Sequence, residues 1–345
     1  MPARPEESPA AVRLTEWTSC GGCAAKWGPS ELGSLVEQLA AGATSPELLV
    51  GLTPSDDATV LRLRPDLALV STTDFFPPLV DDPDDFGAIA AANACSDVFA
   101  MGGEVRLAIA VAVFPDALPA TVAADILNAA ARTVSEAGGD LAGGHTISGP
   151  EPVFGLAVQG TVHPARIWTK GGARPGDQLV LSKPIGTGLV VSAGAADDVA
   201  AAVHWMRMLN RDAAQQLRTV GNGRGPSSCT DVTGFGLAGH AWEMAERSDA
   251  VLRLELQSVP LHRGALELSS RGVSTGGAGR VEQSLNGKVE AAAGLDPALR
   301  ALAMDPQTSG GLLAAVDPGA VGALVAQGWS HVGDVAGGGP SVHLR

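Results

Sequence analysis

Hydrophobic positions follow two different periods along the chain. Alternating or continuous apolar stretches predict strands at 58–63, 67–72, 107–114 and 153–162. Apolar residues at helical spacing predict helices at 29–41, 85–101 and 121–137, and Gly102-Gly103 ends the second of these. This order of elements favours an α/β (α+β) unit, in which helices pack on one side of a mixed β-sheet.

A second unit follows a glycine- and proline-containing connection at 168–176. It begins with a predicted strand at 178–182, continues with helices at 204–218 and 237–247, and closes with a strand–helix–strand through 312–316, 321–326 and 332–335. We therefore expect a flexible N-terminal segment at 1–28, an N-terminal domain at 29–165 and a C-terminal domain at 166–345. A chain of 345 residues is long enough for two hydrophobic cores.

Composition and charge exclude several classes of protein. The net charge of −14 disfavours wrapping a nucleic acid, although a nucleotide can bind if metal ions lie between carboxylates and phosphates. The apolar run at 107–114 is much shorter than the roughly 20 residues that cross a bilayer, so we expect no membrane association. Residues 1–12 lack the apolar core of a secretory signal, and four cysteines make no disulfide framework. The expected compartment is the cytoplasm.

Aspartates stand at or near the ends of predicted strands, where α/β proteins bind ligands. Asp56-Asp57 precede the first strand, Asp74 follows the second, and Asp231 opens the motif Thr230-Asp231-Val232-Thr233-Gly234. Carboxylates gathered in such places suit Mg²⁺. Any one of these aspartates alone is better explained as the cap of a turn.

Asp97 lies inside a helix of small apolar residues. Asn93 is four residues earlier, so both side chains lie on the same face of the helix. A carboxylate buried on such a helix has to be paired or bound to a metal, which favours a ligand role over a solvent-exposed face.

Glycine-rich turns and a cysteine pair are the other candidates. Gly143-Gly144-His145-Thr146 predicts a turn whose backbone N–H groups can approach phosphate, although His145 alone is more typical of a structural hydrogen-bonder. Neither of the two glycine-rich nucleotide fingerprints, the P-loop and the dinucleotide-binding pattern, is present. The pair Cys20 and Cys23 fits a redox site or half a zinc site, but no second pair completes the zinc site. A third interpretation uses Cys23 alone, with Lys26 favouring its thiolate.

Taken together, these motifs resemble the selenophosphate synthetase (selenide, water dikinase) family from about Leu14 to the C-terminus. The blocks that carry the resemblance are Cys23 to Lys26, Asp56-Asp57-Ala58, Ser71 to Phe76, Asn93 to Gly103, Gly143 to Thr146 with Pro150-Glu151-Pro152, Thr230 to Gly236, and Asp305 to Gly311. Their order and spacing are far more specific than any single block.

The resemblance implies a two-domain fold of the aminoimidazole ribonucleotide synthetase type, with a homodimer formed through the N-terminal, ATP- and Mg²⁺-binding domains, each of which contains a mixed β-sheet. It implies that ATP, selenide and water give selenophosphate, AMP and orthophosphate. By position, Asp57, Asp97 and Asp231 hold Mg²⁺, Cys23 and Lys26 are the catalytic residues, and the nucleotide site consists of Lys26, Asp56, Asp74, Asp97, Gly144, His145 and Thr146. The turn at 144–146 could serve the site of the partner subunit.

The chain departs from the family pattern near its N-terminus. Ala24-Ala25 follow Cys23 where many members have Gly-Cys, Cys20 replaces a residue that is often small, and Thr53-Pro54-Ser55 lacks a basic residue sometimes found there. An oxidised Cys20–Cys23 pair is conceivable as an off switch. Three alternatives stay open: a superfamily relative with another acceptor (a thiamine-phosphate, purine-pathway or hydrogenase-maturation enzyme), a regulatory protein without turnover, or a thiol redox protein using Cys20 and Cys23.

Overall fold

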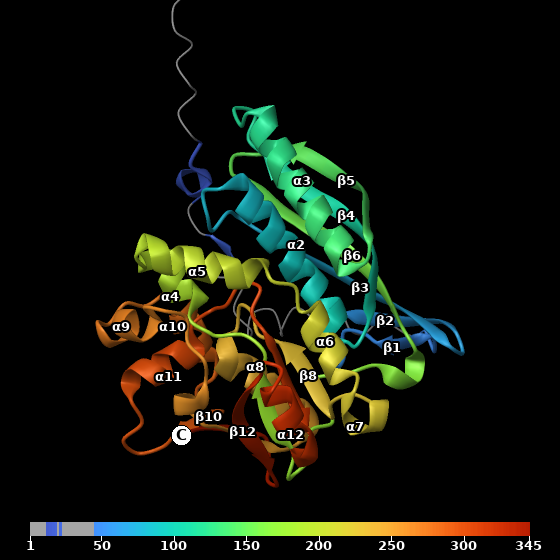
Figure 1. The fold of residues 1–345 in the computed structure, drawn as a ribbon, viewed down its shortest axis with the longest axis vertical. Helices are drawn as coiled ribbons and strands as arrows, with labels where there is room; N and C mark the ends of the chain where they lie inside the picture. Colours follow the sequence, from blue (N-terminus) through green and yellow to red (C-terminus); the bar gives the residue numbers. More distant parts are fainter. Residues whose placement is uncertain (1–11, 19–20, 23–44) are drawn as a thin grey trace, which may run out of the picture.

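Two β-sheets, each covered by helices, form the described part of the chain, which comprises residues 12–18, 21–22 and 45–345 of this computed structural model. Figure 1 shows the six-stranded sheet of the N-terminal half beside the helices and the seven-stranded sheet of the C-terminal half. The helix predicted at 29–41 lies outside the described residues. Within them, no helix combines the length and the apolar character needed to cross a membrane.

The N-terminal sheet has the strand order β1-β2-β3-β6-β4-β5. Only β4 and β5 pair in parallel, so the sheet is mixed, as predicted. Its elements are β1 (Leu48–Val50), β2 (Thr59–Arg64), β3 (Leu67–Phe76), α2 (Pro83–Ala100), β4 (Glu104–Phe114), α3 (Ala120–Ala137), β5 (Asp140–Ser148) and β6 (Val153–Val162), preceded by the short 3-10 helix η1 (Leu14–Trp17).

Helix α2 lies at the centre of the molecule. It starts with Pro83 behind the capping side chain of Asp82, which accepts a hydrogen bond from the backbone N–H of Asp85. One side of α2 packs on the sheet and on α3, and the other contacts α5, α6 and β8 of the C-terminal half (Figure 1). Because α2 is enclosed on nearly every side, its small residues carry no amphipathic pattern. At Gly87, a Cβ would lie 2.2 Å from the carbonyl oxygen of Ile126, so α2 and α3 approach closely.

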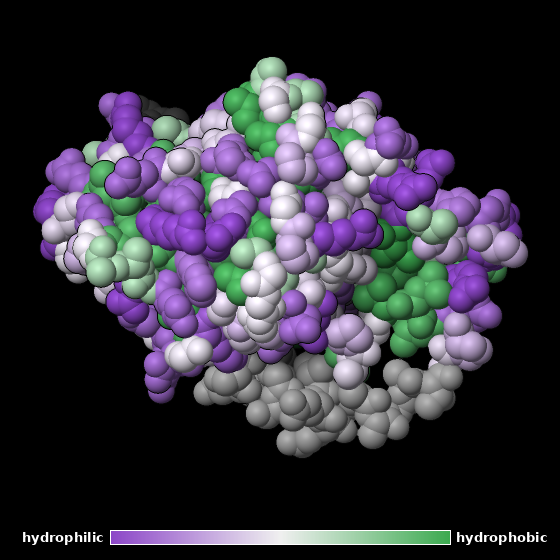
Figure 2. All heavy atoms as spheres, turned by 90° about the horizontal axis from the view of Figure 1, so that it is seen from below, coloured by the Kyte–Doolittle hydropathy of each residue, from purple (hydrophilic) through white to green (hydrophobic). Residues whose placement is uncertain are grey.

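The face of the N-terminal sheet that points away from α2 and α3 is apolar and open. Phe75 on β3, Ile109 on β4 and Ile147 on β5 are 51%, 40% and 52% exposed. Figure 2 shows a hydrophobic patch on the right-hand side of the molecule, the side on which this sheet lies in Figure 1. Open apolar sheet faces of this kind are typical of contact surfaces.

The C-terminal sheet has the strand order β10-β13-β9-β12-β7-β11-β8. Its strands are β7 (Gln178–Leu181), β8 (Ser228–Asp231), β9 (Val251–Leu254), β10 (Val289–Ala291), β11 (Leu312–Val316), β12 (Ser330–Ala336) and β13 (Ser341–Leu344). The helices are α4 (Thr187–Ala193), α5 (Ala196–Arg207), α6 (Arg211–Leu217), α7 (Val220–Gly223), α8 (Gly236–Ser248), α9 (Ala265–Ser270), α10 (Gly276–Ser284), α11 (Pro297–Met304) and α12 (Pro318–Val325), with 3-10 turns η4 (Pro164–Arg166) and η5 (Leu256–Ser258).

Two predicted elements differ from the structure. Residues 143–146 do not form a turn: they belong to β5, because their backbone pairs in register with β4. The helix predicted at 204–218 is divided into α5 and α6 around Asn210. The side-chain amide of Asn210 donates to Ser96 Oγ and to the carbonyl oxygen of Gly310, each at 2.8 Å, so the break serves a contact with α2.

Candidate active site

Asp57 and Asp231 come from different halves of the chain and meet at the joint between them. Asp57 lies in the bend before β2, with its side chain 4% exposed, and Asp231 ends β8 and is 2% exposed. Thr230 donates a hydrogen bond to Asp57 Oδ1 at 3.0 Å, which fixes the Asp56-Asp57 bend against β8. The other oxygen of Asp57, Oδ2, is buried and accepts no hydrogen bond from any described residue.

Asp97 lies on α2 close to the same bend. Its Oδ2 accepts a hydrogen bond from the hydroxyl of Thr72 on β3. Thr59 pairs with Ser71 in the β2–β3 ladder, so Asp57, two residues before Thr59, lies beside the segment that contains Thr72. The three aspartates expected to hold Mg²⁺ are therefore brought toward one region, where β3, α2 and β8 meet.

Asp74 and Asn93 form a second buried polar contact. The amide of Asn93 donates to Asp74 Oδ2, and its Oδ1 accepts from the backbone N–H of Ser309 at 2.8 Å. Asn93 is fully buried and Asp74 is 8% exposed. The face of α2 shared by Asn93 and Asp97 thus points toward the domain joint, and the alternative of a solvent-exposed face is wrong for Asn93.

Lys170 is the functional candidate that the sequence analysis missed. Its ammonium lies 2.9 Å from Asp57 Oδ1 and 3.0 Å from Glu243 Oε2, and its backbone N–H donates to Asp56 Oδ2. Glu243 lies on α8, where His240 Nδ1 is 3.1 Å from its carboxylate. One signal was available: lysines are scarce in this chain, and Lys170 stands at the boundary between the two units.

The charges of this network depend on one another. Burial alone would lower the pKa of Lys170, but the carboxylates of Asp57 and Glu243 hold it well above its ordinary value. Burial would likewise raise the pKa of Glu243, and the ammonium of Lys170 outweighs that effect and lowers it. Burial, followed by the nearby charge of Asp57, raises the pKa of Asp56 to about 7. Lys170 therefore compensates a group of carboxylates that could not all be buried as anions without it.

A second buried lysine lies near Asp231. Lys183 is 4% exposed, and its ammonium donates to the carbonyl oxygens of Met208 and Ser309. Burial lowers the pKa of Lys183 to about 7, although the charge of Asp231 acts in the opposite direction. The side-chain amine of Lys183, charged or neutral, therefore lies against the backbone of the Ser309–Gly311 segment.

Gly144, His145 and Thr146 lie apart from these groups within one chain. They belong to β5, which forms the edge of the sheet opposite β1 and β2. His145 is in register with Val111, Gly155 and Phe75 across β4, β6 and β3, and is exposed. Three strand spacings separate His145 from Phe75, roughly 14 Å. Within a single chain, Gly144, His145 and Thr146 are therefore not brought together with the aspartates.

The two residues expected to be catalytic, Cys23 and Lys26, lie outside the described residues, as does Cys20. The other two cysteines, Cys95 and Cys229, are buried and unbridged. Burial raises the pKa of Cys95 to about 12 and raises that of Cys229 as well. Neither buried thiol is suited to act as a nucleophilic thiolate.

The donor set fits Mg²⁺ bound together with a polyphosphate. Among the described residues, no three His, Cys, Asp or Glu side chains converge closely enough to form a complete metal site by themselves. Mg²⁺ commonly takes one or two carboxylates and completes its octahedron with phosphate oxygens and water. The buried Asp57 Oδ2, which accepts no hydrogen bond, offers such a carboxylate oxygen.

Comparison with known proteins decides the family. Residues 55–162 match "AIR synthase related protein, N-terminal domain", and residues 174–343 match the C-terminal domain of the same name. A selenide, water dikinase from Caldanaerobacter subterraneus subsp. tengcongensis is 44% identical over 88% of this chain and 88% of its own length. A selenide, water dikinase from Myxococcus xanthus is 42% identical over 96% of this chain and 97% of its own. The chain belongs to the selenide, water dikinase family.

Membership of the selenide, water dikinase family confirms the resemblance inferred from the sequence motifs. It supports the expected function over the alternatives, including the thiol redox protein. Solved structures agree on the fold: thiamine monophosphate kinase from Aquifex aeolicus has a TM-score of 0.64 at 15% identity, covering 96% of this chain and 98% of its own. The hydrogenase maturation protein HypE in complex with ATP has a TM-score of 0.57 at 19% identity, covering 87% and 86%. The two-domain α+β fold is thereby confirmed.

Proposed function

We propose that this chain catalyses the reaction named by its family: ATP, selenide and water are converted to selenophosphate, AMP and orthophosphate. One observation carries the assignment of the site. Asp57 of the N-terminal half accepts a hydrogen bond from Thr230, the neighbour of Asp231 in the C-terminal half, and Asp97 on α2 accepts one from Thr72 on β3. A polyphosphate with its counter-ions needs such a group of carboxylates from several elements.

In this proposal Asp57, Asp97 and Asp231 hold Mg²⁺, which, when bound, neutralises phosphate charge and stabilises the charge that develops during transfer. The residues of the chain orient the reactants. The Thr230 and Lys170 contacts direct Asp57 Oδ1 into the protein, so that Oδ2 is the oxygen left for a ligand. Asp56 and Asp74 would line the nucleotide site, to which the proposal also assigns Lys26.

Cys23 and Lys26 supply the selenium-handling part of the proposal. A thiolate at Cys23, favoured by the ammonium of Lys26, would guide the oxidisable selenide without forming a bond to it. Lys26 would also contact the phosphates as a point charge. The chemistry of selenide is consistent with the reducing cytoplasm as the compartment.

We also propose that the chain acts as a homodimer through the open face of its N-terminal sheet. The exposed apolar side chains of Phe75, Ile109 and Ile147 lie on strands of this sheet, and burying them in a contact between two copies would be favourable. A dimer built this way would bring the exposed segment 144–146 of one copy toward the other copy. This accounts for family motif residues that lie far from the aspartates of their own chain.

The direct test is phosphorus NMR of ATP with Mg²⁺ and anaerobic selenide, with wild type and Cys23→Ser side by side. We expect a selenophosphate resonance and AMP from the wild type, and no selenophosphate from the variant. Intact ATP in the wild-type sample would contradict the proposed reaction. Equal selenophosphate formation by both proteins would remove Cys23 from the mechanism.

Mass spectrometry of the selenide-treated enzyme tests a covalent role for Cys23. An S–Se bond between the Cys23 thiolate and selenide requires the loss of two electrons, so a selenium adduct on Cys23 would show that selenium reaches the side chain in an oxidised form. Its absence in an active sample would limit Cys23 to guiding the substrate.

A further inference from the structure

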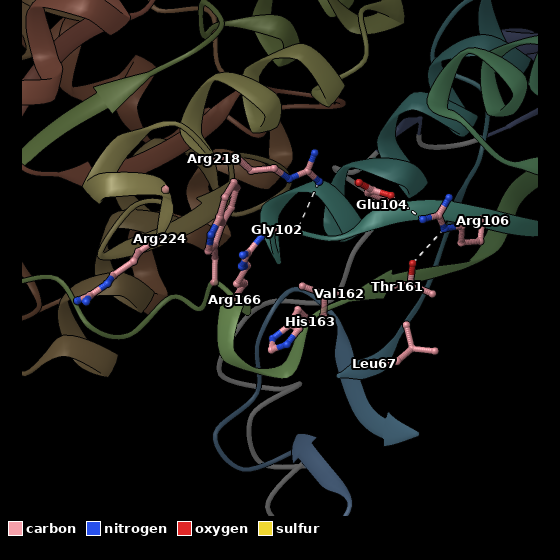
Figure 3. A pocket seen from close by; sticks show the side chains of 12 residues that line it. Leu67, Gly102, Glu104, Arg106, Thr161, Val162, His163, Arg166, Arg218 and Arg224 are labelled. Atoms are coloured by element: carbon pink, nitrogen blue, oxygen red, sulfur yellow. Dashed lines mark hydrogen bonds and ion pairs between the residues drawn. The ribbon is translucent and has the colours of Figure 1, made fainter. Parts of the chain in front are cut away.

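A cavity of about 310 Å³ lies at the joint between the two halves of the chain, away from the aspartates. Strands β3, β4 and β6, the linker at 163–168 and the segment after α6 all contribute to its walls. Figure 3 shows its residues: Leu67, Gly102, Glu104, Arg106, Thr161, Val162, His163, Arg166, Arg218 and Arg224 are labelled. We call this space the basic cavity.

Positive charge dominates the basic cavity, although the chain as a whole carries a net charge of −14. Arginines 106, 166, 218 and 224 line it, against the single carboxylate of Glu104. Glu104 is already paired with Arg106. Most arginines in the described part of the chain have a carboxylate partner within 4.0 Å, whereas Arg166, Arg218 and Arg224 form no ion pair with any described residue.

Arg218 is the most constrained of these side chains. It is partly buried, and its guanidinium donates to the carbonyl oxygen of Gly102 at 3.2 Å (Figure 3). It also donates to the carbonyl oxygen of Gly103 at 2.7 Å. Burial lowers the pKa of Arg218, and neighbouring Arg211 lowers it further against the opposite effect of Glu104. A guanidinium that is held in place by backbone carbonyls and forms no ion pair is prepared to bind an anion.

Packing around Trp168 fixes the two walls of the cavity relative to each other. Trp168 is 4% exposed and lies between Gly102 of the N-terminal half and Gly225 of the C-terminal half. Both glycines have positive φ, and a Cβ would lie 2.9 Å from the indole at Gly102 and 2.2 Å from its nitrogen at Gly225. Because larger residues would be excluded from both positions, the loop that carries Arg224 sits tightly against the linker that carries Arg166.

The basic cavity is separate from the candidate active site. Leu67 lines it at the start of β3, whereas Thr72, the partner of Asp97, is five residues farther along that strand. Five residues of strand span roughly 16 Å. An anion in the cavity would not contact the aspartates.

We propose that the basic cavity binds a small phosphate-type oxyanion and that the bound anion links the N-terminal and C-terminal halves. Guanidinium groups bind phosphate through paired N–H donors, and a cluster in which arginines outnumber the single carboxylate is suited to do this. The volume is near the lower end of the roughly 300–1,000 Å³ range of ligand sites, which fits inorganic phosphate, pyrophosphate or the phosphate of a small ester. Arg106 lies on β4 of the N-terminal half, Arg166 on the linker and Arg218 on the C-terminal half, so one anion bound among them bridges the joint.

The test is isothermal titration calorimetry of the full chain with orthophosphate, pyrophosphate and AMP at constant ionic strength. Chelator is present throughout, because without Mg²⁺ the acidic site has no reason to attract phosphate. The variants are Arg166→Gln, whose exposed side chain makes no hydrogen bond or ion pair with a described residue, and Arg218→Gln. Arg132→Gln is the matched control, since Arg132 is exposed on α3 and pairs with Asp84.

We expect saturable binding to wild type and to Arg132→Gln, and affinity reduced roughly tenfold or more in Arg166→Gln. Binding of AMP as tight as that of inorganic phosphate would identify phosphate esters as the source, and binding of the inorganic forms alone would identify free phosphate. No saturable binding to wild type would overturn the proposal, and so would equal affinities of Arg166→Gln and Arg132→Gln. Circular dichroism on each variant ensures that only folded protein is compared.

Discussion

Replacement of Lys170 by methionine should destabilise the protein more than the same replacement of a more exposed lysine. The side chain of Lys170 is 8% exposed and compensates Asp57, 4% exposed, and Glu243, 23% exposed, at 2.9 and 3.0 Å. Removing one partner of such a buried group leaves uncompensated charge and typically costs about 3–5 kcal/mol. Methionine keeps most of the volume, so the loss reports charge compensation and not a cavity.

The assay is denaturant unfolding followed by circular dichroism, with Lys288→Met as the control. Lys288 is partly buried and lies over the ring of Trp242 at 5.1 Å from its centre, a contact worth about 0.5–2 kcal/mol. Adding Glu243→Gln to Lys170→Met should recover part of the loss, because one buried carboxylate is then neutral. Equal losses in Lys170→Met and Lys288→Met, or no recovery in the double variant, would refute the role assigned to Lys170.

Three further predictions concern the active site, the effect of pH and the assembly. Asp231→Asn should lower selenide-dependent ATP turnover about 100-fold or more. The control Asp249→Asn should leave turnover unchanged, because Asp249 is exposed and has a left-handed backbone conformation that asparagine tolerates. Comparable turnover of the two variants would contradict the ligand role of Asp231. Burial raises the pKa of Asp305 from 3.8 to about 7, so the native state keeps a proton that the unfolded chain releases near pH 4. Between pH 4 and 7, the free energy of unfolding of the wild type should therefore fall by up to about 4 kcal/mol relative to that of Asp305→Asn. If denaturant unfolding gave the same pH dependence for both proteins, the raised pKa of Asp305 would be refuted. Ile147→Arg should yield a monomer by analytical ultracentrifugation, and an unchanged sedimentation coefficient would argue against the proposed sheet-to-sheet dimer.

Local patterns were sufficient for the elements that build the N-terminal half. The run of small residues before Gly102 and the apolar stretches around it predicted α2, β3, β4 and β6 at nearly the observed positions. The aspartates could be found as well, because each stands at a strand end or on a helix too apolar to carry a charge without a reason. Periodicity and residue chemistry are local properties, so sequence alone can detect them.

The remaining features depend on contacts between distant segments. The sequence did not predict β5, because its glycines suggest a turn. The segment is extended because it pairs with β4. The interruption at Asn210 has no local signal, since it exists to reach Ser96 and Gly310. Lys170 is an ordinary linker lysine until the fold brings Asp57 and Glu243 to it.

The same long-range contacts hold the aspartates of the candidate site, Asp57, Asp97 and Asp231, close to one another. Thr230 and Lys170 hold Asp57, Ser309 holds Asn93, and Asn210 holds Ser96. Each contact crosses from the C-terminal half to α2 or to the bend before β2, and each is buried or partly buried. The aspartates are therefore gathered only while the two halves are docked, since Asp57 and Asp97 belong to one and Asp231 to the other. An anion in the basic cavity would act on this same joint from its far side, so its occupancy and the geometry of the aspartates should be coupled through the placement of the two halves.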